Sequence, residues 1–253
     1  MDLRRLEEAA LNAWPAERQQ LFDGWLLRCS GGYTKRANSV TPLYQATLDP
    51  AAKIAACERF YADQGLPCIF RLPSFAEGGL DDVLARRGYR ELDRTLVLAR
   101  DLHPSAAPPT RGSPAAPAAA EAALDGWLDA YSALSESSPA QRAGHRAILG
   151  RIAARPAYLL LRAGDTPLAC GLGVLEGEHF GLFDIVVAAE RRGQGLGRQL
   201  IDSLLAWAIG RGARRAYLQV VAGNAPARRL YDRLGFSEQY QYWYRQAPPE
   251  AGR

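Results

Sequence analysis

The sequence predicts an α+β fold, in which a mixed and mostly antiparallel sheet is flanked by helices, and it predicts this plan twice. Strand-like apolar runs alternate with segments of helical spacing, and the second half contains consecutive strands, as an antiparallel meander does. The segment HPSAAPPTRGSPAAPAAA at 103–120 is rich in Pro and Ala, has no periodicity and is typical of an extended linker. We therefore expect one domain at 1–102 and a second at 121–253.

The second half is expected to contain four helices and five strands. After a glycine-rich turn, Leu200, Leu204 and Ala208 recur at helical spacing and predict a helix with one apolar face. Helices are expected at 121–134, 141–154, 195–211 and 226–234, and strands at 157–162, 168–174, 181–187, 216–221 and 239–245.

The first half carries part of the same plan. An amphipathic helix is expected near the N-terminus, followed by strands at 25–28, 39–43, 67–72 and 95–99 and helices at 51–63 and 80–87. Its closing sequence LARRGYRELDRTLVLAR parallels YDRLGFSEQYQYWYR at the end of the second half, which indicates a weak internal repeat. The glycine-rich turn has no counterpart there, because the corresponding place reads LDPAAKIAACERF.

The composition is that of a globular protein. Hydrophobic residues make up 48% and charged residues 23%, and the net charge is only +4. No dense Lys/Arg block is present, so we expect no nucleic-acid partner, although the mild positive balance suits an anionic ligand. No apolar run approaches the roughly 18–20 residues of a membrane span, and the N-terminal segment lacks the apolar core of a signal peptide. We expect a cytoplasmic protein with no membrane partner.

The four cysteines are expected to be buried free thiols. They are scattered in apolar sequence and lack metal-binding spacing such as C-x-x-C, so no metal site is expected. A catalytic cysteine is the weaker alternative, because no His or helix N-terminus lies nearby to lower a thiol pKa. The residues are Cys29, Cys57, Cys68 and Cys170.

The loop Arg192-Gly193-Gln194-Gly195-Leu196-Gly197 lies between a strand-like run and the strongest expected helix. Its glycines permit close approach of the backbone to a ligand, and the helix start offers unpaired N–H groups that suit a phosphate. Arg191, Arg192 and Arg198 add positive charge. The alternative is a tight turn with solvated arginines. A dinucleotide fingerprint does not fit, because Arg198 stands where a third glycine is required.

Further residues downstream complete a pattern that resembles the GNAT superfamily of N-acetyltransferases over about residues 121–246. The first family motif, Arg/Gln-x-x-Gly-x-Gly/Ala, is met by the loop, and the second is an Asn, a Tyr seven residues later and a Gly-Phe pair. The matching residues are Arg192, Gly195, Gly197, Asn224, Tyr231, Gly235 and Phe236. The resemblance implies an acetyltransferase that uses acetyl-coenzyme A as cosubstrate and an amine as acceptor.

The same resemblance implies a cofactor site. Strands 181–187 and 216–221 would splay apart into a V-shaped slot for pantetheine. Backbone groups of Ile185, Val186 and Val187 would pair with it, as a peptide pairs with a strand edge. The Val187 N–H would face the thioester oxygen as an oxyanion donor, and N–H groups from Gly193 to Arg198 would bind the pyrophosphate.

Tyr231 and Asn224 each have two interpretations. Tyr231 is the expected general acid, because a phenol with a pKa near 10 can protonate the departing thiolate. Alternatively, it is an aromatic residue packed between Ala227 and Gly235. Asn224 either binds the pantetheine arm or caps the helix that starts at Ala225, and both roles are compatible.

The general base is where the sequence departs from similar enzymes. Enzymes that acetylate the N-terminal alanine of a ribosomal protein resemble 181–236 but place a catalytic glutamate where Gln219 stands. Asp184 is the first candidate to replace it, followed by His179 and Glu178; a water chain or an amine that arrives neutral are alternatives. Asp184 could also be a polar residue on an exposed strand face, and His179 a plain loop residue.

The first half, with DGWLLRCSGGYTKRANSV, resembles the degenerate first domain of bacterial tandem acetyltransferase-like proteins. It should not bind coenzyme A, and we expect it to shape the acceptor pocket. Asp23–Trp25 and Thr34–Ser39 are the candidate lining residues, or else a turn and a sheet edge. The acceptor stays open among small amines, amino acids, antibiotics, peptide N-termini and lysine side chains. A sensor or scaffold that binds acetyl-coenzyme A without transferring the acetyl group is the alternative function.

Overall fold

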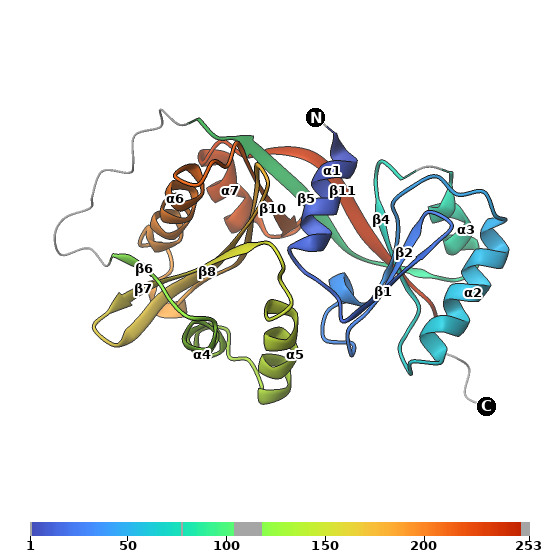
Figure 1. The fold of residues 1–253 in the computed structure, drawn as a ribbon, viewed down its shortest axis with the longest axis horizontal. Coiled ribbons are helices and arrows are strands. Elements are labelled where there is room, and N and C mark those ends of the chain that lie inside the picture. The colour runs from blue at the N-terminus through green and yellow to red at the C-terminus, as the bar shows by residue number, and fades with distance from the viewer. Residues whose placement is uncertain (1, 77, 104–117, 249–253) are drawn as a thin grey trace.

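The computed structural model describes residues 2–76, 78–103 and 118–248, and in this part of the chain a single 11-stranded sheet runs through the molecule (Figure 1). The strands are β1 (Arg18–Phe22), β2 (Trp25–Cys29), β3 (Val40–Pro42), β4 (Ile69–Pro73), β5 (Arg90–Asp101), β6 (Ala119–Glu121), β7 (Arg155–Ala163), β8 (Thr166–Glu176), β9 (His179–Val187), β10 (Arg215–Val221) and β11 (Ser237–Gln246). Their spatial order is β1-β2-β3-β4-β11-β5-β10-β9-β8-β7-β6. Only β3–β4 and β9–β10 pair in parallel, which confirms the mixed, mostly antiparallel sheet.

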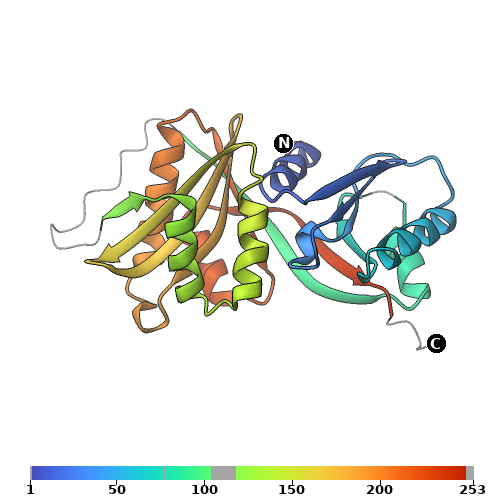
Figure 2. The same ribbon diagram turned by 60° about the horizontal axis from the view of Figure 1, so that its bottom comes forward.

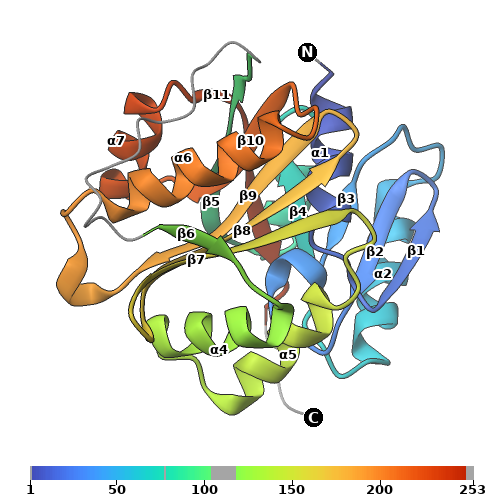
Figure 3. The same cartoon turned by 60° about the vertical axis from the view of Figure 1, so that its left-hand side comes forward.

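Helices cover the sheet at both ends. They are α1 (Leu3–Asn12), α2 (Pro50–Ala62), α3 (Leu80–Arg86), α4 (Leu124–Leu134), α5 (Pro139–Leu149), α6 (Leu196–Ile209) and α7 (Ala225–Arg233), with short 3₁₀ turns η1 (Lys35–Ala37) and η2 (Ala189–Arg191). In the second half, α6 and α7 lie on one side of the sheet and α4 and α5 on the other (Figure 3). The apolar face expected for α6 is buried, because Leu200, Leu204 and Ala208 are each 0% exposed.

The two halves exchange their closing strands. β5 of the first half lies between β10 and β11, while β11 of the second half lies between β4 and β5. Both strands are long and cross the middle of the molecule side by side, antiparallel to one another (Figures 1 and 2). The repeated sequences at the two chain ends thus form equivalent elements, but each half completes its sheet with the other's strand.

The core beneath α4 and α5 belongs to both halves. Leu6 and Trp14 from the N-terminal segment are buried in one cluster with Trp127 and Ile148 of the second half. Fully burying one such side chain contributes about 1.5–3 kcal/mol. Together with the exchanged strands, this shared core joins the two halves.

Element boundaries differ from expectation at a few places. β1, with the sequence RQQLF, was not predicted because it is exposed and has no apolar alternation. The helix expected from 121 begins at Leu124, since 119–121 pair with β7 as β6. Residues 104–117 of the expected linker lie outside the described residues. The helix expected to reach 154 ends at Leu149, with Gly150 as its cap, and β7 starts at Arg155.

Each of the four cysteines is a buried free thiol. Burial raises the pKa of Cys57 and of Cys68 to about 12, so neither is a nucleophile at neutral pH. Within the described residues, no group of three or more His, Cys, Asp or Glu side chains is arranged to hold a metal ion. None of the helices described here has the length and apolarity needed to cross a bilayer.

Candidate functional site

A wedge opens in the sheet between β9 and β10. The two strands pair in parallel from His179 opposite Arg215 to Leu182 opposite Leu218, and in the described chain their pairing ends there. Beyond that point β9 continues along β8 as far as Val187, whereas β10 continues along β5 as far as Val221. Each strand therefore keeps its outer partner and turns a free inner edge toward the wedge, as the family resemblance implied for 181–187 and 216–221.

The inner edge of β9 presents backbone donors to the wedge. The N–H of Ala188 donates to Leu168 O at 2.9 Å, on the β8 side. Because successive N–H groups along a strand point to opposite sides, the Val187 N–H points into the wedge. Ile185, Val186 and Val187 are all partly exposed there.

The glycine loop ends in an uncapped helix N-terminus. Gly193 has φ 76° and Gly195 has φ 85°, a left-handed conformation that favours glycine. Gly195 is the N-cap of α6 and has no side chain to accept a hydrogen bond. The first helical bond runs from Gln199 N to Gly195 O at 3.0 Å, so the N–H groups of 196–198 have no acceptor within the helix.

This helix start has the properties of an anion site. The first turn of α6 contains no acidic residue, and the helix dipole adds partial positive charge. Arg191, Arg192 and Gln194 are exposed around the loop. Arg198 is also exposed and makes only a 3.4 Å contact with Asp202, so its charge remains accessible to a ligand.

The equivalent helix start in the first half is closed to an anion. The carboxylate of Asp49 accepts a hydrogen bond from Ala52 N at 2.9 Å at the start of α2. Pro50 occupies the first turn and has no N–H to offer. A negative cap in this position would repel a phosphate, which agrees with the expectation that the first half does not bind coenzyme A.

Tyr231 and Asn224 lie on the helix that follows β10. Tyr231 is 9% exposed and packs edge-on against Phe236, with ring centroids 6.0 Å apart. Burial raises the pKa of its hydroxyl to about 12, which keeps the phenol protonated at neutral pH. Asn224 caps α7, since its Oδ1 accepts from Ala227 N at 3.2 Å. The capping role is confirmed, while the contact of Asn224 with pantetheine stays a prediction.

Asp184 lies in a strained bulge where the wedge begins. Phe183 pairs with Leu172 and Val186 with Cys170, so two residues of β9 oppose one residue of β8. Asp184 has φ 51°, and a left-handed non-glycine residue costs on the order of 1–3 kcal/mol. The opposing residue is Gly171, where an added Cβ would come within 2.7 Å of Ile185 Cδ1. A larger residue at 171 would therefore have to displace the end of the Ile185 side chain.

The sequence did not reveal the partner of Asp184. His145 Nε2 on α5 lies 3.0 Å from Asp184 Oδ2, and the His145 side chain is 1% exposed. The imidazole is held by four aromatic rings, those of Trp14, Tyr33, Trp127 and Tyr131, with centroids 4.7–5.9 Å away. A single histidine in an expected helix carries no signal of this contact, because its partner lies 39 positions away in the sequence.

The other candidates for the base lie elsewhere or are already engaged. Gln219 Oε1 accepts a hydrogen bond from Tyr242 at 2.8 Å. His179 stands at the closed end of the wedge, opposite Arg215, and Glu178 precedes it. At about 3.3 Å per strand residue, His179 is roughly 16 Å from Asp184 along β9.

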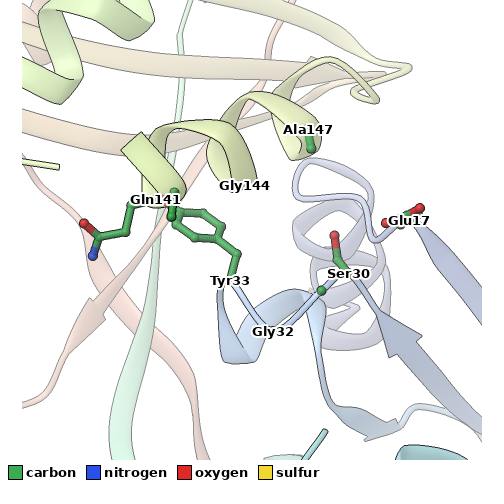
Figure 4. A pocket seen from close by; sticks show the side chains of 9 residues that line it. Glu17, Ser30, Gly32, Tyr33, Gln141, Gly144 and Ala147 are labelled. Atoms are coloured by element: carbon green, nitrogen blue, oxygen red, sulfur yellow. The ribbon is translucent and has the colours of Figure 1, made fainter. Parts of the chain in front are cut away.

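A pocket of about 400 Å³ lies between the two halves near His145 (Figure 4). Tyr33 forms one wall, with its ring against Gly144 of α5, where a Cβ would come within 2.8 Å of the ring. The other lining residues are Glu17, Ser30, Gly31 and Gly32 from the first half and Ala140, Gln141 and Ala147 from the second.

The two clusters proposed to line an acceptor cleft separate in the structure. Arg36, within Thr34–Ser39, lies over the ring of Phe183 at 5.9 Å, next to Asp184. Asp23 instead accepts hydrogen bonds from the backbone of 47–48. Trp25 is buried in the separate core of the first half. Asp23 therefore stabilises a turn and Trp25 packs the core of the first half.

Comparisons with known proteins agree with this geometry. A family model described as "Probable histone acetyltransferase Rv0428c C-terminal" matches residues 1–245. The chain is 33% identical over 245 residues to "Uncharacterized N-acetyltransferase YobR" of Bacillus subtilis (strain 168), covering 96% of this chain and 98% of that protein.

Solved structures share the fold at lower identity. A GCN5-related N-acetyltransferase from Kribbella flavida superposes with a TM-score of 0.72 at 21% identity, covering 97% of this chain and 95% of the other. A tandem GNAT protein from the clavulanic acid biosynthesis pathway superposes with a TM-score of 0.62 at 16% identity, covering 84% of this chain and 76% of that one.

Proposed function

The chain belongs to the GNAT superfamily of acetyltransferases, and from that premise we propose that it transfers the acetyl group of acetyl-coenzyme A to a primary amine by direct attack. Enzymes of this superfamily use acetyl-coenzyme A as cosubstrate and an amine as acceptor. In our proposal 121–253 is catalytic, 1–102 shapes the acceptor pocket, and 103–120 links them.

One observation carries the proposal: the wedge between β9 and β10 opens beside an uncapped, glycine-led helix N-terminus. Pantetheine would lie in the wedge and pair with the inner edge of β9 at Ile185–Val187. The pyrophosphate would lie on the N–H groups from Gly193 to Arg198. The thioester oxygen would then face the Val187 N–H, which would stabilise the tetrahedral intermediate.

Asp184 would act as the base and Tyr231 as the acid. Asp184 is the carboxylate at the point where the wedge begins, and the His145 ring would fix its orientation by donating Nε2–H to Oδ2. The collapsing intermediate expels a thiolate, which would take the proton of Tyr231. The raised pKa of Tyr231 supports this role, because the hydroxyl remains a proton donor at every physiological pH.

Replacing Tyr231 with phenylalanine tests the acid directly. We expect Tyr231→Phe to lower kcat by about 10²–10⁴, the range for general acid–base catalysis, with little change in the KM for acetyl-coenzyme A. Thiol release in the presence of a panel of amines measures both. The alkaline loss of activity that deprotonation of Tyr231 would cause should not appear in the pH profile below about pH 10, because its pKa is raised.

Tyr158→Phe is the matched control. Tyr158 is also buried, and burial alone raises its pKa to about 12, but it lies on β7, two strands away from β9. The control should keep wild-type kcat. Full activity of Tyr231→Phe at neutral pH would remove the proposed acid. Tight binding of acetyl-coenzyme A without thiol release for any amine would instead favour a sensor or scaffold.

A further inference from the structure

Arg36 places a guanidinium against the aromatic residues beneath the wedge. It belongs to η1, and its Cζ lies 4.5 Å from the centroid of Trp14 and 5.9 Å from that of Phe183. Trp14 in turn contacts the His145 ring at 5.4 Å, and Phe183 directly precedes Asp184. The guanidinium therefore extends from the first half to the neighbourhood of Asp184, the proposed general base in the second half.

The Arg36 charge has no carboxylate partner in the described part of the chain. Its neighbour Lys35 pairs with Asp93 at 2.8 Å, whereas no ion pair forms between Arg36 and any described acid, Asp184 included. The side chain is only partly exposed. A guanidinium held on an aromatic face with its N–H donors unused is suited to binding a carboxylate in bidentate fashion.

Arg36 and Asp184 act on the same two tyrosines with opposite sign. Burial raises the pKa of the Tyr33 hydroxyl, the Asp184 carboxylate raises it further, and Arg36 lowers it. The pKa of Tyr131 is likewise raised by burial and then by Asp184, and lowered by Arg36. The two charged groups thus lie around one site, close enough to influence the same hydroxyls, although no ion pair joins them.

We propose that Arg36 binds a carboxylate of the acceptor, so that the acceptor is an amino acid whose ammonium group faces Asp184. This inference rests on the proposed acetyl transfer and names its substrate class. A free amino acid carries both charges within a few ångströms, and it would fit between an anion and a cation that are not paired. A peptide lysine or a simple amine has no carboxylate beside its amine and would leave Arg36 unsatisfied.

The reaction balances with these groups. The acceptor ammonium gives one proton to Asp184, and the neutral nitrogen attacks the thioester carbon. The C–S bond breaks, and the sulfur takes the proton of Tyr231. The amide nitrogen loses its second proton through solvent to Tyr231, and Asp184 releases its proton to bulk water. One ammonium and one thioester therefore yield one amide, one thiol and one proton.

Matched acceptors test the proposal. Thiol release is first measured for the twenty free amino acids, and the best of them is compared with its primary amide, its decarboxylated amine and a lysine peptide blocked at both ends. We expect kcat/KM for the acid to exceed that for the amide at least about tenfold. Arg36→Gln should lower kcat/KM for the acid by about 10–100-fold and change the amide by less than about threefold.

Lys35→Gln is the control, because it removes one positive charge from the same 3₁₀ turn at a residue already paired with Asp93. It should leave the preference for the acid unchanged. A second control tests whether Arg36→Gln is folded. A thermal unfolding midpoint near that of wild type, together with unchanged acetyl-coenzyme A binding by calorimetry, would establish this.

Two outcomes would overturn the inference. If the amide, the amine or the blocked peptide reacts as well as the acid, or if Arg36→Gln slows all acceptors equally, the carboxylate site is wrong while acetyl transfer stands. If no amine of any class releases thiol although acetyl-coenzyme A binds, the proposed function fails, and the acceptor assignment fails with it.

Discussion

Replacing Gly195 or Gly197 with alanine tests whether the loop binds a phosphate or is only a tight turn. Gly195 has φ 85° and ψ −5°, and a Cβ added there meets nothing within 4 Å. Gly197 lies inside α6, and its added Cβ would meet Val187 and Leu230 side chains at 3.5 and 3.6 Å, ordinary contact distances. Gly195→Ala is therefore purely a backbone perturbation, and Gly197→Ala is a conservative change two residues away.

The magnitudes follow from the backbone conformations. A left-handed alanine costs about 1–2 kcal/mol relative to glycine. The exposed loop can relax to avoid that cost when empty, but the ligand needs the N–H groups aimed as the structure has them. Binding must restore the strained conformation, so we expect acetyl-coenzyme A affinity to fall about 5–30-fold in Gly195→Ala. Gly197→Ala should keep its affinity and gain up to about 1 kcal/mol of stability from helix propensity.

Isothermal titration calorimetry with acetyl-coenzyme A and thermal unfolding without ligand measure the two quantities separately. Wild-type affinity in Gly195→Ala would show that the loop conformation is not used for binding. An equal loss of affinity in both variants would contradict the reasoning in another way, because it would mean that bulk in the loop matters and backbone conformation does not.

Two further predictions concern the base and the exchanged strands. His145→Gln keeps an N–H that can donate to Asp184, so its kcat should stay within about tenfold of wild type. Asp184→Asn should lose about 10²-fold or more in kcat. If thiol-release assays find both variants equally inactive, His145 has more than a positioning role. A chain of 121–253 alone lacks β5, the shared neighbour of β10 and β11. It should aggregate in size-exclusion chromatography or unfold without cooperativity in circular dichroism, and co-expression with 1–102 should restore a folded protein. A monodisperse 121–253 that unfolds cooperatively would show that the strand exchange is dispensable.

The local elements could be read from the sequence because their signals are local. The periodicity of Leu200, Leu204 and Ala208 and the glycines before them define α6 and its loop without reference to the rest of the chain. The wedge between β9 and β10 followed from the family resemblance, which implies that 181–187 and 216–221 splay apart. Exposed β1 had no such pattern, so nothing in RQQLF distinguished a strand from a loop.

Long-range pairings were beyond the sequence for a physical reason. β5 and β11 are similar in sequence, and either could in principle close the sheet of its own half; register and partner depend on the packing of the whole molecule. The contact between His145 and Asp184 spans 39 positions and lies at a bulge in β9. Arg36 likewise reaches the site from a turn more than a hundred residues away in sequence.

The exchange of closing strands has a consequence for synthesis on the ribosome. When the first half has emerged, β4 and β5 are both made, but the strand that lies between them, β11, comes last among the described elements. Two strand edges must remain unpaired until β11 has been made, and unpaired edges are where other chains add. The N-terminal half therefore cannot finish folding before the C-terminal half exists, and this protein should depend more on chaperones than a tandem chain whose domains close in order.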